Sequence, residues 1–419
     1  MTKKKLSDLY VKNGMDIPFF IMLLIILAIG LIMLLSSSYI YAFHFEDGDS
    51  LHFFKRQGVF AVIGIAVIWF GSHFNYQYLK KISILLWFAS VLLVGGALLQ
   101  NGDAEIKRWL NLGLFSFQPS ELAKCFLIIY LAYGLNKDRK KILSTKPSKA
   151  WWAAPINEKL GGKFYITTEF STLVYYGFII MVTTAPVIAS SHLSGTIIML
   201  LIGMSMLWLG ECRARWFAIV GVIVAVVVVY VIFNYEDVPV LRDYMAERIK
   251  AWLIKDYEPD KARWQINHSL YALGSGGFLG SGIGNSKQKY LYVSECHTDF
   301  IFSIIGEELG FVGSVVIIAL FGALVCRGVY IGMRSRDRFG ALLCFGMMAH
   351  LGLQVMFNIA VITDTVPNTG IPLPFFSYGV TALLINLAEM GVVLSVSRQA
   401  DLKKVYSMKK QKTVKSAQS

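Results

Sequence analysis

Ten long apolar runs dominate this 419-residue sequence, and each is long enough to cross a lipid bilayer as a helix. Short polar interruptions set their limits at residues 17–43, 57–73, 82–99, 119–135, 171–189, 194–210, 215–234, 299–326, 338–362 and 373–396. Hydrophobic residues make up 55% of the chain, charged residues only 16%, and the mean hydropathy is +0.56. These values exclude an ordinary soluble protein and predict an all-α polytopic membrane protein with about ten transmembrane helices.

The charges between the apolar runs predict the orientation of the chain. Loops on the side of the N-terminus are rich in lysine and arginine, as in "NKDRKKILSTKPSK", whereas loops on the other side, such as "FHFEDGDS", are acidic or mixed. Because cytoplasmic loops carry the excess of Lys and Arg, we expect both termini in the cytoplasm. Topology and anionic lipid explain the formal net charge of +13 better than nucleic acid does, so no nucleic-acid partner is expected.

This topology divides the chain into three parts. Residues 1–16 form a cytoplasmic N-terminal tail, residues 17–396 the ten-span membrane domain, and residues 397–419 a basic cytoplasmic tail. One connection is unusually long, because residues 235–298 form a large extracellular loop between spans seven and eight. Within it, "VLRDYMAERIKAWLIKDY" predicts an amphipathic helix that lies on the outer leaflet. Its apolar face consists of Leu241, Tyr244, Met245, Ile249, Trp252 and Leu253.

Three acidic residues follow this loop, although ionisable groups near a bilayer are costly. Asp299 lies where the loop enters span eight. Its carboxylate can cap the first turn of that helix, or it can act as a general base at the membrane surface, and position alone does not decide. Glu307 and Glu308 lie two turns deeper and point about 100° apart, so they are expected to serve different neighbours.

Other polar residues fall into two groups. In the loop before span four, Glu121 and Lys124 are spaced for a salt bridge, or with Arg108 they suit an outer cavity for a pyrophosphate-bearing substrate. Span nine carries a polar stripe at i, i+4 and i+8, which we interpret as interhelical hydrogen bonding. The stripe consists of His350, Gln354 and Asn358.

Glycine and proline mark two irregular segments. "ALGSGGFLGSGIGNSKQK" holds six glycines between Gly274 and Gly284, which allow close backbone approach, but it lacks the G-K-[ST] ending of a nucleotide loop. "NTGIPLPFFSYG", residues 368–379, is a broken entry into span ten, which is tolerated where backbone lines a cavity. Segments 108–124, 264–299 and 367–379 are therefore expected to converge on one outward-facing site.

These segments also carry a family resemblance. From about residue 15 to 400 the chain resembles the SEDS proteins (shape, elongation, division and sporulation), membrane glycosyltransferases that polymerise lipid II, the peptidoglycan precursor. The motifs, in order, are "RWLNLG" with "FQPSELAK", "WQ" followed by "SLYALGSGGFLGSGIGNSKQK", "HTDFIFSIIGEELG" and "PNTGIPLPFFSYG". "GIGNSKQK" and "ECHTDF" are more similar to the cell-division and sporulation members than to the elongation member. The sequence departs from the family pattern in "YVSECHTD", in "SSHLSGT", at His268 and at Val380, which affects substrate positioning and subfamily.

The resemblance implies a role for individual residues. Asp299 of the T-D-F-I-F motif would be the catalytic base that deprotonates the acceptor sugar, while undecaprenyl pyrophosphate leaves from the donor. Arg108, Lys124 and Lys289, or a divalent cation (Mg²⁺ or Mn²⁺), can offset the charge of the leaving group. The other residues implied in the substrate cavity are Glu121, Gln265, Ser275, Gly276, Gly277, His297, Thr298, Glu308, Pro372 and Ser377.

The implied function is polymerisation of lipid II on the outer face of the bacterial cytoplasmic membrane, at the division septum. The implied partners are a class B penicillin-binding protein, which is a transpeptidase, and other divisome proteins. Two alternatives stay open, because intramembrane acids and broken helices also suit a transporter. They are a lipid II flippase and a non-catalytic scaffold that recruits a transpeptidase.

Overall fold

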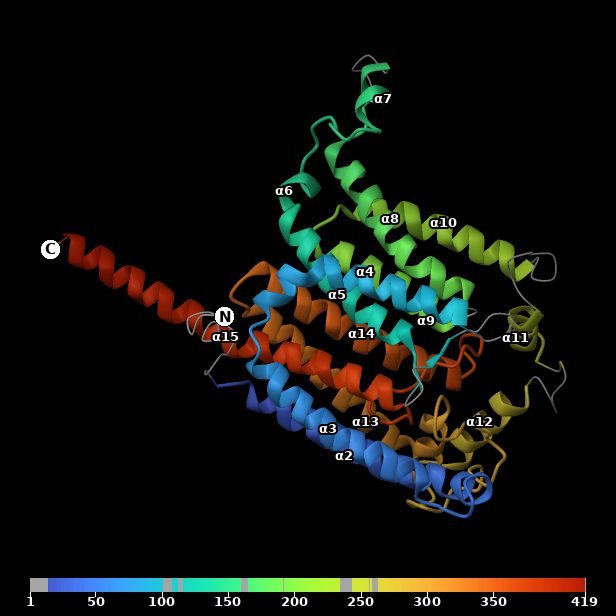
Figure 1. Cartoon of the computed structure of the whole chain (residues 1–419). Helices are drawn as coiled ribbons and strands as arrows, with labels where there is room; N and C mark the ends of the chain where they lie inside the picture. Colours follow the sequence, from blue (N-terminus) through green and yellow to red (C-terminus); the bar gives the residue numbers. More distant parts are fainter. Residues whose placement is uncertain are drawn as a thin grey trace.

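The protein is described by a computed structural model that is built almost entirely of helices (Figure 1). The structure describes residues 14–100, 108–111, 116–159, 165–190, 192–233, 243–255, 257 and 263–418. Within these ranges, strands β1 (Leu110–Asn111) and β2 (Ser116–Phe117) pair antiparallel, with Leu110 opposite Phe117. The helices are α2 (Ile17–Phe45), α3 (His52–His73), α4 (Gln77–Gln100), α5 (Pro119–Lys137), α6 (Arg139–Ile142), α7 (Ala154–Lys159), α8 (Thr168–Ala189), α9 (Leu193–Leu209), α10 (Ala214–Phe233), α11 (Asp243–Leu253), α12 (Trp264–Ser275), α13 (Ile301–Met333), α14 (Arg338–Ile362) and α15 (Val380–Gln418).

Each of the ten predicted spans coincides with one of these helices. Seven of the described helices are, by length and composition, able to cross a membrane, namely α2, α3, α4, α8, α13, α14 and the first part of α15. Two shorter apolar helices, Leu193–Leu209 and Ala214–Val226, fall on the sixth and seventh predicted spans. The all-α polytopic fold is therefore confirmed, while the number of spans, the domain limits and the side on which each loop lies stay predictions.

The tenth span differs from its predicted limits. It begins at Val380 rather than at residue 373, and α15 runs past the predicted boundary at 397 to Gln418. Pro372 and Pro374 each lack a backbone N–H and restrict the residue before them, so the chain up to Gly379 stays irregular. The predicted broken entry into this span is confirmed.

The two ends of the membrane domain lie together. The backbone N–H of Asp16, which precedes α2, donates to Ser397 Oγ on α15 at 3.1 Å. The carboxylate of Asp16 also pairs with Arg327 on α13 at 2.9 Å. Both ends of the bundle's sequence are thus at one end of its helices, as an even number of spans requires.

Small residues let the inner helices approach closely. A Cβ built on Gly391 of α15 would lie 3.3 Å from the Cα of Ile68 on α3, and one built on Gly64 of α3 would overlap Leu387. Helices in a bilayer gain little from further apolar burial, so close van der Waals packing holds such pairs together. This packing gives the rigid frame on which the irregular segments rest.

A break in α13 accommodates the glycine-rich segment. Gly310 has φ 68° and ψ −167°, which interrupts the helical ladder. The residues before the break accept hydrogen bonds from the segment, Ser281 N–H to Glu307 O and Gly282 N–H to Glu308 O, both at 3.0 Å. Beyond the break, the N–H of Phe311 donates to Gly277 O at 2.9 Å. The inserted segment therefore satisfies backbone groups that the break leaves unpaired.

The predicted amphipathic helix is present as α11. Leu241 lies outside the described residues, as do the side chains of Tyr244 and Met245. The indole of Trp252 donates to Asp364 O at 3.2 Å, so this part of the apolar face meets the loop before α15. The position of α11 on the outer leaflet stays a prediction.

Candidate functional site

A cavity of about 340 Å³ lies where the three irregular segments meet. Its lining comes from segments 108–124, 265–300 and 368–379, together with the start of α9 and side chains of α14 and α15. The convergence expected from the sequence is therefore present. Eight of the predicted site residues line the cavity, namely Arg108, Glu121, Lys124, Gln265, Thr298, Asp299, Pro372 and Ser377.

Asp299 is held in place through its backbone. Asn358 on α14 donates from Nδ2 to Asp299 O at 2.8 Å and to Ile371 O at 2.6 Å, which joins two of the converging segments. The residue at the N-terminal cap of α13 is Phe300, and no side chain makes a capping hydrogen bond there. The capping alternative for Asp299 is therefore wrong. No residue that the structure describes hydrogen-bonds the Asp299 carboxylate, which leaves it available to a ligand.

The surroundings of Asp299 make it a better base than an exposed carboxylate. Burial and the neighbouring Glu295 raise the pKa of Asp299 to about 6, while Arg248 and Arg108 oppose that rise. A general base works best when its pKa is close to the working pH. At neutral pH this carboxylate is ionised, yet it binds a proton more readily than a solvated aspartate does.

Gly370 lies directly against this carboxylate. Its φ is +67°, and a Cβ at this position would lie 2.7 Å from Asp299 Oδ2. Ser194 Oγ donates to Gly370 O at 3.3 Å and thereby ties the glycine to the start of α9. Only glycine combines this backbone conformation with such close approach.

Ser377 fastens the irregular segments to each other. Its hydroxyl donates to Thr298 O at 2.6 Å and accepts from Leu373 N–H at 2.7 Å. The N–H of Tyr378 donates to His297 O at 2.8 Å, which adds a second link on the same side. The backbone that leads into Asp299 is thus bound to the entry into α15.

Basic side chains also line the cavity, and two of them, Arg108 and Arg248, act on the Asp299 carboxylate. Lys124 Nζ lies 2.8 Å from Glu121 Oε2, and both side chains are almost fully buried. The predicted salt bridge is therefore present, and the same pair lines the cavity with Arg108. The guanidinium of Arg248 on α11 donates to Asn368 O at 2.8 Å and adds a further positive charge.

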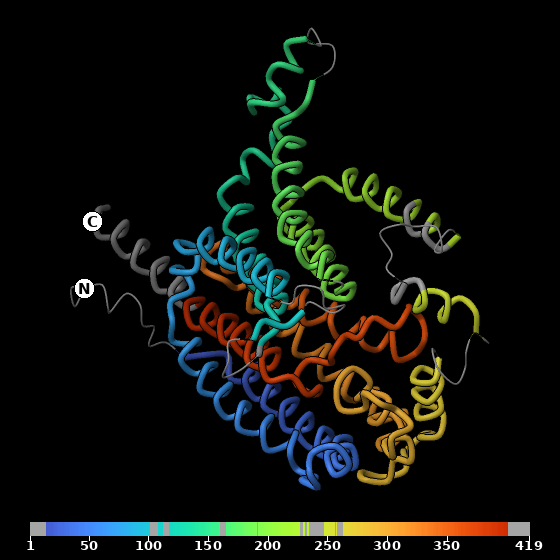
Figure 2. Tube along the Cα trace, turned by 45° about the vertical axis from the view of Figure 1, so that its right-hand side comes forward, coloured from blue at the N-terminus to red at the C-terminus, as the bar shows by residue number. Residues whose placement is uncertain are grey.

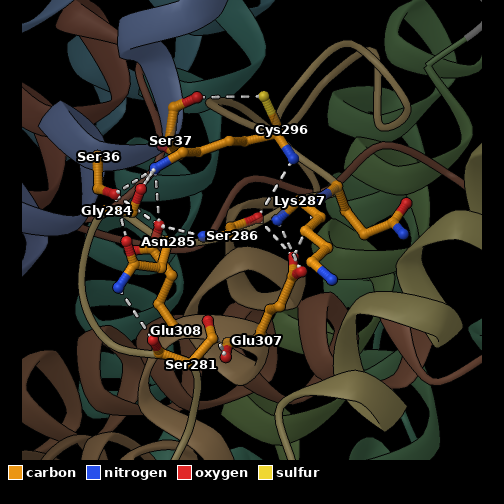
Figure 3. Close-up of polar contacts among 12 residues, drawn as sticks. Ser36, Ser37, Ser281, Gly284, Asn285, Ser286, Lys287, Cys296, Glu307 and Glu308 are labelled. Atoms are coloured by element: carbon orange, nitrogen blue, oxygen red, sulfur yellow. Dashed lines mark hydrogen bonds and ion pairs between the residues drawn. The ribbon is translucent and has the colours of Figure 1, made fainter.

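Glu307 and Glu308 share a neighbour, contrary to the expectation from their angular separation, because Ser286 donates its hydroxyl to Glu307 and its backbone N–H to Glu308 at 3.3 Å (Figure 3). Glu307 accepts from Lys287 N–H at 2.8 Å and from the hydroxyl of Ser286. Glu308 accepts from Ser36 Oγ on α2 at 2.7 Å and from Lys289 Nζ at 3.0 Å. Both acids hold the end of the glycine-rich segment on α13.

Six predicted site residues do not line the cavity. Lys289 and Glu308 neutralise each other, because a buried carboxylate requires a partner, so Lys289 faces Glu308 rather than a leaving group. Gly276 lies against the carbonyl of Gly306 and so uses its small size for packing on α13. The residues outside the lining are Ser275, Gly276, Gly277, Lys289, His297 and Glu308.

His297 occupies an aromatic cluster beside the cavity. Its ring centre lies 4.5 Å from those of Tyr41 and Phe53. Burial lowers the pKa of His297 to about 4, so the ring is neutral at physiological pH. Its backbone carbonyl, rather than its imidazole, contributes to the position of Asp299.

Comparison with known proteins identifies the family. The family model of cell cycle proteins that covers FtsW, RodA and SpoVE matches residues 17–402. The chain belongs to the SEDS family.

Relatives and solved structures agree with this assignment. A Geobacter sp. (strain M18) protein named "Probable peptidoglycan glycosyltransferase FtsW" is 34% identical over 391 residues, which cover 92% of this chain and 97% of the relative. Stage V sporulation protein E of Bacillus subtilis (strain 168) is 34% identical over 404 residues, covering 95% and 99%. A chain of a peptidoglycan synthase complex that coordinates polymerization and crosslinking has a similar fold, with a TM-score of 0.69 at 23% identity and coverage of 92% and 98%. RodA of Thermus thermophilus has a TM-score of 0.61 at 23% identity, with coverage of 92% and 97%.

Several residues of the SEDS cavity were missed by the sequence analysis. Arg248 lies among the polar residues of the predicted amphipathic helix, which gives no signal for a cavity, and His192 is part of "SSHLSGT", a departure from the family pattern. His192 lies 3.1 Å from Ser120 Oγ and 3.3 Å from Gln118 Nε2, and burial together with Arg108 lowers its pKa to about 3. A neutral imidazole on the cavity wall therefore stands beside the cationic groups.

Within the polar stripe on α14 of this SEDS protein, His350 bonds to another helix as predicted, whereas Asn358 bonds to backbone outside the helices. His350 Nδ1 lies 3.0 Å from Glu389 Oε2 on α15, and Asn358 joins the loop segments as described above. Gln354, the middle residue of the stripe, lines the cavity. The sequence could have indicated this position, because Gln354 lies on the same helix face as Asn358.

A metal site built from protein side chains alone is absent from the part of the chain that the structure describes. Within those ranges, no group of three or more His, Cys, Asp or Glu side chains is placed to hold a metal ion. Positive charge in the SEDS cavity comes instead from Arg108, Lys124 and Arg248.

Proposed function

We propose that this SEDS protein is a peptidoglycan glycosyltransferase that polymerises lipid II on the outer face of the cytoplasmic membrane during cell division. The observation that carries the proposal is the Asp299 carboxylate, with a pKa raised to about 6, in a cavity that is also lined by Arg108, Lys124 and Arg248. Relatives named as glycosyltransferases of the FtsW group, similar over more than nine-tenths of the chain, support it.

In the proposed reaction, Asp299 accepts the proton of the acceptor sugar's 4-hydroxyl. The resulting oxygen attacks the anomeric carbon of the donor, and the bond from that carbon to undecaprenyl pyrophosphate breaks. Arg108, Lys124 and Arg248 are suited to stabilise the negative charge that develops on the pyrophosphate. Cleavage of this bond drives the transfer, so no nucleotide is required.

The proposed partner is a class B penicillin-binding protein, a transpeptidase that crosslinks the new strands. Support comes from a solved relative that is a chain of a synthase complex in which polymerization and crosslinking are coordinated. Work at the septum with other divisome proteins, with both termini in the cytoplasm, belongs to the same proposal. The positive-inside pattern supports that orientation.

A reconstitution with purified lipid II tests the function. The protein, in liposomes and with its transpeptidase partner, is expected to convert lipid II to glycan strands that a muramidase degrades. Movement of lipid II between leaflets without strands would identify a flippase instead. Neither strands nor movement, with the partner demonstrably bound, would identify a scaffold.

A further inference from the structure

Between α5 and α8 the chain leaves the helical bundle and returns to it. Residues 143–159 and 165–167, called here the basic projection, contain α7 and stand apart from the other helices (Figures 1 and 2). The base is ordered, because Ser148 N–H donates to Ile166 O and Thr168 N–H to Lys146 O, both at 2.8 Å. Asn157 Nδ2 bridges the two sides through Ile166 O at 3.1 Å. These bonds make the basic projection a defined structure rather than a free tail.

The basic projection lies at the end of the bundle opposite the cavity. Helix α5 has Glu121 and Lys124 at the cavity in its first turns and ends at Lys137, where the chain leads into the basic projection. Arg139 pairs with Glu211, in the loop between α9 and α10, at 2.9 Å, which fixes the base to that end. With the cavity facing outward, this end faces the cytoplasm.

The direction of the basic projection matters as much as its position. In Figure 1 α7 is displaced mainly sideways from the long helices α2, α3 and α14. Long membrane helices run mainly across the bilayer. A sideways extension from their ends therefore runs along the membrane surface instead of away from it.

The surface chemistry of the basic projection fits that location. Lys146, Lys149 and Lys159 are exposed, and none forms an ion pair with a described residue. Trp151 is 88% exposed and the nearby Ile156 is 42% exposed. Tryptophan and lysine together are typical of the interface between membrane and water, where the ring enters the headgroup layer and the ammonium groups meet anionic lipid.

We propose that the basic projection binds the cytoplasmic surface of the same membrane, with Trp151 among the headgroups and the three lysines on anionic phospholipids. An acidic protein would match the charge equally well. The lipid surface is favoured because the extension runs sideways and because so large an aromatic side chain is left uncovered. The inference rests on the outward-facing cavity of the proposed function, whereas the binding itself does not require polymerase activity.

Spin labelling of the full-length protein in nanodiscs tests this proposal. A nitroxide is attached at Trp151→Cys in a Cys326→Ser background, because the other cysteines are buried. Collision rates with oxygen and with a water-soluble nickel chelate are compared in phosphatidylcholine and in equal parts phosphatidylcholine and phosphatidylglycerol. We expect a several-fold fall in nickel collisions and a rise in oxygen collisions in the anionic bilayer, both reversed by high salt.

Two sets of lysine replacements distinguish binding by the basic projection from a general attraction of positive charge to anionic lipid. Lys146→Gln, Lys149→Gln and Lys159→Gln together should abolish the response to anionic lipid. Lys80→Gln with Lys81→Gln, which removes charge from the first turns of α4, should leave the response intact. A label that collides with nickel equally often in both bilayers would overturn the proposal and leave the surface to a protein partner.

Discussion

Gly370 faces Asp299 so closely that a Cβ on the glycine would lie 2.7 Å from the Oδ2 atom of the carboxylate. The glycine also has φ +67°, a conformation that L-residues rarely adopt. The loop before α15 therefore forms one side of the pocket that holds the carboxylate. Its backbone contributes shape at a position where no side chain fits.

Replacement of Gly370 by alanine should disturb the site more than the fold. Backbone strain at this φ costs roughly 1–2 kcal/mol, and a displaced carboxylate can lower the rate by on the order of 10²-fold. The matched control is Gly379→Ala, because a Cβ there would make only an ordinary 3.7 Å contact with Ala382. Polymerisation rate and melting temperature are measured for both. Equal rates for the two variants would contradict the assigned role of Gly370.

The buried pair of Lys289 and Glu308 should show strong coupling in stability. Lys289→Met or Glu308→Gln alone leaves a buried partner without its counterpart, which costs about 3–5 kcal/mol, whereas the double replacement should cost less than the two losses added together. Thermal unfolding in detergent measures each loss. Lys55→Met, which breaks an exposed pair with Asp49, is the control and should change little. Additive losses at 289 and 308 would show that the pair is not coupled.

The pH dependence of the reaction should report Asp299. A base must be deprotonated, so the rate should rise with pH up to about 6 and then level off. Glu295 helps to raise the pKa of Asp299, and Glu295→Gln should therefore move the rising limb to lower pH. Rates of strand formation across the pH range provide the measurement. A limb that stays in place in Glu295→Gln would argue against Asp299 as the titrating group.

Cysteine labelling should establish the topology. Labels at Lys141 and Arg336, both exposed, should react only from the cytoplasm, and a label at Gly284 only from outside. Arg336 is preferred to the neighbouring Ser335 for the label, because Ser335 is buried and would react poorly from either side. Reversed reactivity at any of the three positions would contradict the predicted orientation.

The sequence predicted the helices well, because a helix surrounded by lipid or by protein requires a long apolar run. It also predicted that irregular segments converge, because polar backbone at membrane depth requires protein or a cavity around it. It could not place Arg248, because the same amphipathic pattern fits a helix on lipid and a helix bound to a loop. Nor could it decide whether Lys289 faces a ligand or Glu308, since that depends on contacts between residues far apart in the chain.

The two roles considered for Asp299, helix cap and general base, could likewise not be separated from the sequence. Helix entry and catalytic position share one sequence signal, an acid before an apolar run. The structure separates them, because α13 begins after Phe300 without a side-chain cap. The backbone of Asp299 is held by Asn358, 59 residues away, and the residues before it are held by the entry into α15, contacts that the sequence does not reveal.

The most direct measurement is the rate of strand formation from purified lipid II by the Asp299→Asn protein. Glu295→Gln is the matched control, because it removes another acid from the same loop. Asparagine keeps the size of the side chain and removes only the base. Because general-base catalysis contributes on the order of 10²–10⁴-fold, we expect a loss of that size at neutral pH in a folded, inserted Asp299→Asn protein and near-normal activity in Glu295→Gln. An Asp299→Asn protein that forms glycan strands at the wild-type rate would contradict the assignment of Asp299 as the base.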